Sequence, residues 1–135
     1  MANLIIDDEL SNLMHAESFC YSPPKANKRL VLLHGWSADA DDLMPLGHEL
    51  IRAENLSESI ELLAFRAPDL GPEGVGRQWY RLFPPDWDSV PLAVKALQDR
   101  LRALSRTKIP LSQTVMLGFS QGGAMAIDAG LSLPM

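Results

Sequence analysis

The sequence holds little of what several classes of protein require. Cys20 is the only cysteine among 135 residues, so an internal disulfide is impossible and no Cys/His cluster offers a zinc site. Lysine and arginine form no run longer than two residues, and a net charge of −5 opposes binding to nucleic-acid phosphates or anionic membranes. No apolar run approaches the roughly 18 residues of a membrane span, and residues 1–10 (MANLIIDDEL) lack the basic start and apolar stretch typical of a signal peptide. We therefore expect a soluble, cytoplasmic protein with no metal, no nucleic-acid partner and no transmembrane segment.

Short apolar runs alternate with helical patterns along the chain. Residues 29–35 (RLVLLHG), 60–65 (IELLAF) and 114–120 (TVMLGFS) read as strands buried on both faces. Residues 17–24 (ESFCYSPP) are expected to form an antiparallel edge strand, in which Cys20 is half-buried rather than a reactive thiol. The alternation predicts an α/β fold, a mostly parallel sheet with helices on both faces.

Two segments between these strands have the spacing of helices. In residues 39–55, Asp39 or Asp41 is a candidate cap, and Leu43, Leu46 and Leu50 are expected to form one apolar face. After a Gly- and Pro-rich loop over residues 66–88, residues 89–106 show apolar positions separated by 4, 3, 4 and 3. These positions are Val90, Val94, Leu97, Leu101 and Leu104. Ser89 is the expected cap of this helix, and Pro91 is tolerated in its first turn.

The third strand ends in a G-x-S-x-G motif formed by Gly118, Ser120 and Gly122. A sharp strand-to-helix turn forces the serine into a strained conformation, and side chains two positions before and after it would collide with backbone. Such a turn lifts the hydroxyl clear of the sheet, at a helix N-terminus that favours developing negative charge. The alternative is an ordinary tight connection in which Ser120 only caps the helix. The preceding strand and a second motif upstream favour the nucleophile.

The second motif is His34-Gly35-Trp36, which follows the first buried strand. Acyl-transfer sites of this architecture stabilise the oxyanion with two N–H groups, one from the residue after the nucleophile and one from this loop. We expect the amides of Gln121 and Trp36 to be these donors. Gly35 would let the backbone approach a substrate closely.

Three blocks of the sequence together resemble the phospholipase/carboxylesterase family of α/β-hydrolases, which includes the acyl-protein thioesterases. The blocks are LLHGWSADADDLMPLGHEL, FRAPDLGPEGVGRQWYRL and VMLGFSQGGAMAIDAG, and G-F-S-Q-G-G is the most specific piece. The resemblance implies a serine hydrolase of carboxylic esters or thioesters with no cofactor. It also implies that the loop carrying Gln78, Trp79 and Tyr80 borders the acyl pocket. Family members often have an acidic residue directly after this loop's W-Y/F pair, where this chain has Arg81.

The base that should activate Ser120 is missing from the sequence after it. In α/β-hydrolases the triad follows the order Ser, Asp or Glu, His, yet no histidine follows Ser120. Asp128 lies two turns into the next helix, where a solvated surface position is expected. His15 and His48 fit surface or half-buried positions, and only His34 lies near the site. We do not expect His34 to be the base, because no acid is placed to orient its ring.

These observations predict that residues 1–135 form a single, incomplete α/β-hydrolase domain, the N-terminal portion of a hydrolase, truncated after the nucleophile strand and helix. The chain is expected to be inactive alone, because a serine without a base is a poor nucleophile. Two alternatives are a non-catalytic, acyl-binding remnant and one half of a split enzyme. The strand at residues 114–119 would form an exposed sheet edge, which makes self-association plausible.

Overall fold

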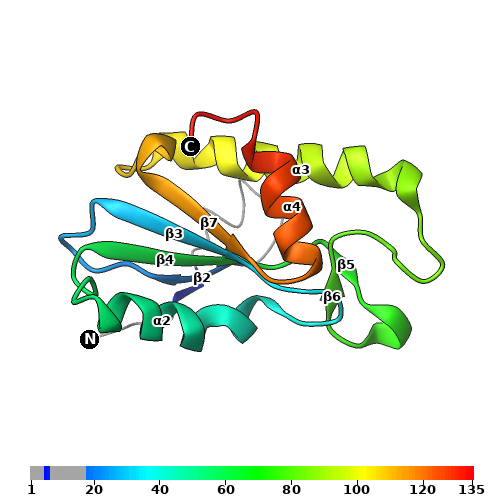
Figure 1. Ribbon diagram of the computed structural model, residues 1–135, viewed down its shortest axis with the longest axis horizontal. Coiled ribbons are helices and arrows are strands. Elements are labelled where there is room, and N and C mark those ends of the chain that lie inside the picture. Colours follow the sequence, from blue (N-terminus) through cyan, green and yellow to red (C-terminus); the bar gives the residue numbers. More distant parts are fainter. Residues whose placement is uncertain (1–4, 7–17) are drawn as a thin grey trace.

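The computed structural model describes residues 5–6 and 18–135, so the predicted position of His15 lies outside the described residues. A five-stranded sheet with the order β1-β2-β4-β3-β7 forms the centre of the molecule (Figure 1). Its strands are β1 (Ile5–Ile6), β2 (Ser18–Tyr21), β3 (Lys28–Leu33), β4 (Ile60–Phe65) and β7 (Thr114–Gly118). β3 is parallel to β4 and to β7, which confirms the mostly parallel sheet.

Three α-helices within the described residues cover the two faces of this sheet (Figure 1). They are α2 (Met44–Ala53), α3 (Val90–Ala103) and α4 (Gln121–Gly130). α2 lies on one face, and α3 and α4 lie on the other. In the part of the chain that the structure describes, no helix combines the length and apolarity that crossing a membrane requires.

The two faces of the central strands have separate apolar cores. Leu32 and Leu62 point to the α2 side, whereas Val31, Leu63 and Phe65 point to the side of α3 and α4. All five are buried to within 1% of full burial. Alternation of buried residues on both faces is what a parallel sheet between two helical layers requires, because successive side chains of a strand point in opposite directions.

The path of the chain reverses its direction across the sheet at β3. From β3 the chain passes through α2 to β4 on one side, and from β4 it passes through α3 to β7 on the other. In register, Leu33 lies opposite Phe65 of β4 and opposite Gly118 of β7. The carboxyl ends of the three strands therefore meet at one edge, and the loops after β3 and β7 leave toward opposite faces. Such a switch point is where open α/β sheets form their binding crevices.

The ends of the sheet differ in part from the sequence prediction. β2 is antiparallel to β4 as expected, but it is no edge strand, because β1 pairs with its other side. Cys20 in β2 is 8% exposed, so it is more buried than expected. The segment 66–88 is more regular than a simple loop, since it contains the hairpin of β5 (Asp69–Leu70) and β6 (Arg77–Gln78).

The predicted apolar face of the first helix is wrong at two of its three positions, since only Leu43 packs against the core. Leu46 and Leu50 are 45% and 41% exposed, and the residues that face the sheet are Met44, Gly47 and Ile51. The helix is rotated relative to the expectation because the chain first makes a 3₁₀ turn over Ala40–Leu43, and the α-helix begins only at Met44. A Cβ on Gly47 would lie 3.0 Å from Leu32 Cδ1, so this glycine allows close packing on the sheet.

The caps of the helices follow the prediction at one of two places. Asp39 caps the 3₁₀ turn before α2 in a capping box with Asp42. Ser89 stands at the N-cap position of α3, but its side chain makes no capping hydrogen bond and donates to the carbonyl of Asp86 instead. Pro91 lies in the first turn of α3, as expected.

We predict that Ile51→Ala lowers the free energy of unfolding by about 2–5 kcal/mol, because it empties a buried site between α2 and the sheet. Leu50→Ala is the matched control, and it should lower the free energy of unfolding by only about 0.5 kcal/mol, since Leu50 is on the solvent side of the helix. Chemical denaturation of both variants measures the difference. Equal losses would contradict the observed orientation of α2.

Candidate active site

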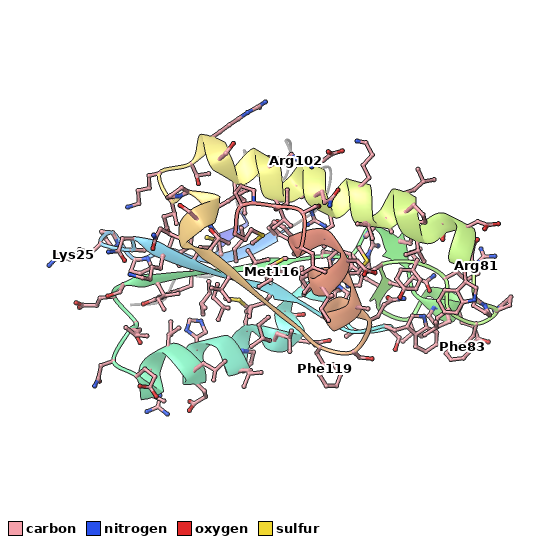
Figure 2. All side chains as sticks on the ribbon, turned by 45° about the horizontal axis from the view of Figure 1, so that its top comes forward. Lys25, Arg81, Phe83, Arg102, Met116 and Phe119 are labelled. Carbon is pink, nitrogen blue, oxygen red and sulfur yellow. The ribbon has the colours of Figure 1, made fainter. Side chains whose placement is uncertain are left out.

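The site lies at the carboxyl ends of β3 and β7, where the switch point of the sheet places two loops side by side. The turn between β7 and α4 carries Phe119 and Ser120, both of which are exposed. Phe119 projects away from the body of the protein, and its side chain is 65% exposed (Figure 2). The opposite loop carries His34, Gly35 and Trp36. The two motifs are therefore neighbours, although Gly35 and Phe119 are 84 positions apart in the sequence.

The turn at Ser120 has the strained geometry expected of the motif. Ser120 has φ 54° and ψ −118°, a region that residues with a side chain rarely occupy. A Cβ on Gly118 would overlap the carbonyl of Gly122, and a Cβ on Gly122 would overlap the carbonyl of Leu33. The first turn of α4 thus lies directly against the ends of both strands, and only glycine fits at these two positions.

The serine side chain does not serve as a helix cap. Ser120 stands at the N-cap position of α4, yet its hydroxyl makes no capping hydrogen bond. The amides of Gly123 and Ala124 are bonded instead by the backbone carbonyl of Ser120. Within residues 18–135 the hydroxyl has no hydrogen-bond partner, so it is available to a ligand.

Two backbone amides beside Ser120 are equally available. Among the described residues, no acceptor is bonded to the N–H of Trp36 or to the N–H of Gln121. The loop at Gly35 touches the turn at Ser120, because a Cβ on Gly35 would lie 3.1 Å from Phe119 Cδ2 and 3.5 Å from Ser120 Cβ. Two unbonded N–H groups and one unbonded hydroxyl therefore lie on two adjoining loops.

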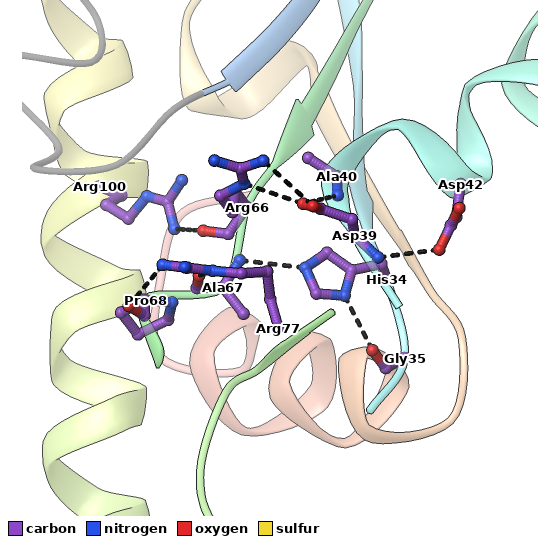
Figure 3. Close-up of polar contacts among 10 residues, drawn as sticks. All are labelled: His34, Gly35, Asp39, Ala40, Asp42, Arg66, Ala67, Pro68, Arg77 and Arg100. Carbon is purple, nitrogen blue, oxygen red and sulfur yellow. Dashed lines mark hydrogen bonds and ion pairs between the residues drawn. The ribbon is translucent and has the colours of Figure 1, made fainter. Parts of the chain in front are cut away.

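His34 is part of the framework of this site. Its Nδ1 lies 2.8 Å from the carbonyl of Gly35, and its Nε2 accepts the N–H of Ala67 at 3.0 Å (Figure 3). The ring is thus neutral with the proton on Nδ1, and neither nitrogen is free to take a proton from Ser120. Burial is the main reason why the pKa of His34 is lowered from its ordinary value. The structure gives His34 the role of joining the loops after β3 and β4.

The Arg66–Asp39 ion pair and Arg77 hold these loops from the side (Figure 3). Arg66 binds both carboxylate oxygens of Asp39, at 2.9 and 3.0 Å. Partial burial acts to raise the pKa of Asp39, but hydrogen bonds from Arg66 and from the N–H of Ala40 lower it overall. Arg77 donates to the carbonyls of Ala67 and Pro68, at 3.0 and 2.7 Å.

The segment Gln78-Trp79-Tyr80 lies against both motifs. Gln78 Oε1 accepts the indole N–H of Trp36 at 3.0 Å. Trp79 is 2% exposed, and its indole N–H donates to the carbonyl of His34 at 2.8 Å. The side chain of Gln121 accepts the N–H of Trp79 and donates to the carbonyl of Tyr80, both at 2.9 Å. The structure brings the three residues to the site, with Trp79 beneath it and half-buried Gln78 and Tyr80 beside it.

Asp128 and His48 lie away from these groups. Asp128 is exposed on α4, as expected. His48 on α2 is half-buried, also as expected, and packs edge-on against Tyr21 with ring centroids 4.9 Å apart.

Sequence analysis missed the buried arginine of this region. Arg100 is 5% exposed, donates to the carbonyl of Arg66 at 2.7 Å and lies 4.2 Å from the ring centroid of Phe65. Burial lowers its pKa to about 9. The signal was its place in the apolar stripe of α3, three residues after Leu97 and directly before Leu101.

A comparison with known families supplies the wider context. The sequence profile described as phospholipase/carboxylesterase matches residues 15–135. The chain belongs to this family. A search of curated proteins finds no match.

Solved structures agree with this family and its fold. The crystal structure of esterase PE8 is 29% identical with a TM-score of 0.73, and the match covers 85% of this chain and 57% of that one. A phospholipase/carboxylesterase from Dyadobacter fermentans is 21% identical with a TM-score of 0.60, covering 84% of this chain and 52% of that one. The α/β-hydrolase fold is thus confirmed, and the chain spans a little more than half the length of these two structures.

We predict that His34 makes stability depend on pH. The lowered pKa in the folded state means that the unfolded chain binds the proton more readily, so its contribution is complete above the unfolded value near 6.5 and falls as pH decreases. In the wild type, the contribution of His34 to the free energy of unfolding should fall between pH 7.5 and 5.5 by at most about 1.4 kcal/mol per pH unit. His34→Gln should remove this part of the pH dependence. Denaturation at both pH values measures this effect, with His48→Gln as the control. A slope unchanged in His34→Gln would contradict the role of His34.

Proposed function

We propose that this chain carries the nucleophile and the oxyanion-binding groups of a serine hydrolase that acts on carboxylic esters or thioesters. The observation that supports this proposal most is the exposed, strained Ser120 beside two unbonded amides. Helix capping does not explain the strained backbone, because the side chain of Ser120 makes no capping hydrogen bond. Strain that the surrounding structure maintains is a property of functional positions.

The proposed reaction proceeds in two steps through an acyl-enzyme. Ser120 Oγ attacks the carbonyl carbon while its proton passes to a base. The oxyanion of the tetrahedral intermediate accepts hydrogen bonds from the N–H groups of Trp36 and Gln121. The intermediate then expels the alcohol or thiol, which takes up the proton, and leaves the acyl group on Ser120. Water attacks this ester in the same way and regenerates the serine. These steps need neither a metal nor an organic cofactor.

Both oxyanion donors are backbone groups, so the proposal assigns them by their position and not by the chemistry of their side chains. Gln121 is the first residue of α4, where unbonded N–H groups and the helix dipole favour negative charge. Trp36 follows the glycine that touches Ser120. The acyl part of the substrate would be apolar, because exposed Phe119 adjoins Ser120 and the ring of Trp36 packs edge-on against exposed Phe83.

The base is the group that the described residues do not provide. Both nitrogens of His34 are engaged, and His48 packs against Tyr21 on the α2 side of the sheet. Full turnover therefore requires an imidazole and a carboxylate from another segment or another chain, as in a split enzyme. The second candidate function is a non-catalytic acyl-binding protein, which the unpartnered hydroxyl of Ser120 also permits.

We predict that a fluorophosphonate probe labels Ser120 slowly and that added imidazole accelerates this labelling. A general base contributes about 10²–10⁴-fold to such attack, and free imidazole should restore part of it. Mass spectrometry of the labelled peptide measures the rate, with Ser120→Ala as the negative control and Ser112→Ala as the exposed-serine control. Equal labelling of the wild type and Ser120→Ala would refute the nucleophile.

Turnover of a short-chain p-nitrophenyl ester separates the remaining alternatives. If the probe labels Ser120 but the chain releases no carboxylic acid from the ester, an external base is needed for turnover. Rapid turnover without imidazole, abolished by His34→Ala, would mean that His34 is the base after all.

We also propose that two copies of the chain pair along β7. Within the described residues β7 has one neighbouring strand, and Val115 on it is 65% exposed. An apolar groove between β7 and α4 includes Val115, Ile127 and Met135. Residues 109–127 hold no charge, so this edge carries none of the lysines that usually block edge-to-edge pairing, and a second copy could pair with it about a two-fold axis.

We predict that Val115→Lys converts a concentration-dependent dimer into a monomer, because it places a charge on the pairing edge. Sedimentation velocity over a range of concentrations measures the distribution. Val75→Lys is the matched control, since Val75 is 60% exposed in the segment between β5 and β6, away from this edge. A wild-type chain that stays monomeric at all concentrations would exclude the interface.

A further inference from the structure

The two proposed oxyanion donors belong to different elements of the fold. Trp36 is in the loop after β3, and Gln121 is in the first turn of α4. An oxyanion needs both N–H groups at about 2.7–3.1 Å, so a small change in their separation removes one of the two bonds. Something in the structure must therefore fix the loop relative to the helix.

A continuous path of hydrogen bonds joins the two donors. It starts at the side chain of Gln121, whose Oε1 accepts the N–H of Trp79 and whose Nε2 donates to the carbonyl of Tyr80. It continues through the indole of Trp79, whose N–H donates to the carbonyl of His34. His34 is two residues before Trp36. Each end of the path thus lies on, or two residues from, a proposed donor.

This path is buried and closely packed. Gln121 and Trp79 are 5% and 2% exposed. The ring centroids of Trp79 and His34 are 5.4 Å apart. Arg100 Cζ lies 5.9 Å from the ring centroid of Trp79. A buried hydrogen bond is costly to break, because the groups left behind lose both the partner and water. The bonds therefore hold a single arrangement.

The chemistry of the two residues matches this path better than a direct role. An oxyanion donor at position 121 needs only a backbone N–H, which does not explain a glutamine. Its side chain is needed because it must accept from one backbone group and donate to the next. Trp79 is too deeply buried to touch a substrate, so it can act only through the groups that it bonds, which are His34 and Gln121.

We propose that Trp79 and the side chain of Gln121 are positioning residues that set the distance between the Trp36 and Gln121 amides. The inference rests on the proposed function, since it assigns these amides to the oxyanion. It adds two side chains that influence the reaction without touching the substrate.

The test uses Gln121→Met, which keeps the length of the side chain but removes both bonds, Trp79→Phe, which removes the indole N–H, and their double variant. We expect each single change to slow fluorophosphonate labelling in imidazole by about 3- to 100-fold, part of the 10²–10³-fold that a lost donor costs. The double variant should be no slower than the slower single variant, because both changes break one path. Gln98→Met and Trp87→Phe are the controls, and neither should alter labelling.

Labelling is measured where circular dichroism shows every variant to be folded, so a slower rate does not come from unfolding. A second readout does not depend on the nucleophile. In ¹H–¹⁵N spectra the Trp36 amide should shift in Gln121→Met and stay in place in Gln98→Met.

The outcomes separate the two proposals. If the wild type is not labelled but the Trp36 amide shifts, the nucleophile fails in this chain and the coupling stands. If the wild type is labelled and both single variants react at its rate, the coupling is refuted and the nucleophile stands. An unmoved Trp36 amide, or losses that multiply in the double variant, would also overturn the coupling.

Discussion

The approach of α4 to the end of β3 is the constraint on which the site depends. Gly122 lies so close to the carbonyls of Leu33 and His34 that no side chain fits there. This contact places the first turn of the helix beside the loop that follows β3, and it forces Ser120 into its strained conformation because the chain must turn at once from strand to helix. The proposed nucleophile and the two proposed oxyanion donors thus lie together because of this close backbone contact at a switch point of the sheet.

A contact of this kind needs a rigid surrounding, and here polar groups supply it. His34, Arg77 and Arg100 each bond to backbone carbonyls or amides of the segment after β4. Directional hydrogen bonds from these side chains leave the segment few alternative arrangements, whereas apolar packing alone tolerates small shifts. One of them, His34, also makes the region sensitive to acid, since a proton on its Nε2 would displace the N–H of Ala67. Rigidity at the site and sensitivity to pH thus have a common cause.

The features that could be predicted from the sequence are local ones. The G-x-S-x-G spacing, the buried strands β3 and β4, and α3 follow from sterics and periodicity within a few residues. The predicted burial of residues 114–120 on both faces is wrong, because β7 is mostly half-buried and Val115 on it is 65% exposed. The rotation of α2 could not be predicted, because a 3₁₀ turn shifts which residues face the sheet. The pairing of β1 with β2 could not be predicted either. The same holds for the hydrogen bond between Gln121 and Trp79, because these two residues are 42 positions apart. Arg100 shows the limit most clearly, since only the tertiary structure shows which carbonyl receives its bond.

The central claim is that Ser120 and the amides of Trp36 and Gln121 act on the same reacting group. The most direct measurement is a crystal structure of the chain with a phosphonate bound covalently to Ser120, a mimic of the tetrahedral intermediate. We expect the phosphonyl oxygen to lie about 2.7–3.1 Å from both amide nitrogens. A phosphonyl oxygen that points to solvent, or that is bonded by neither amide, would contradict it.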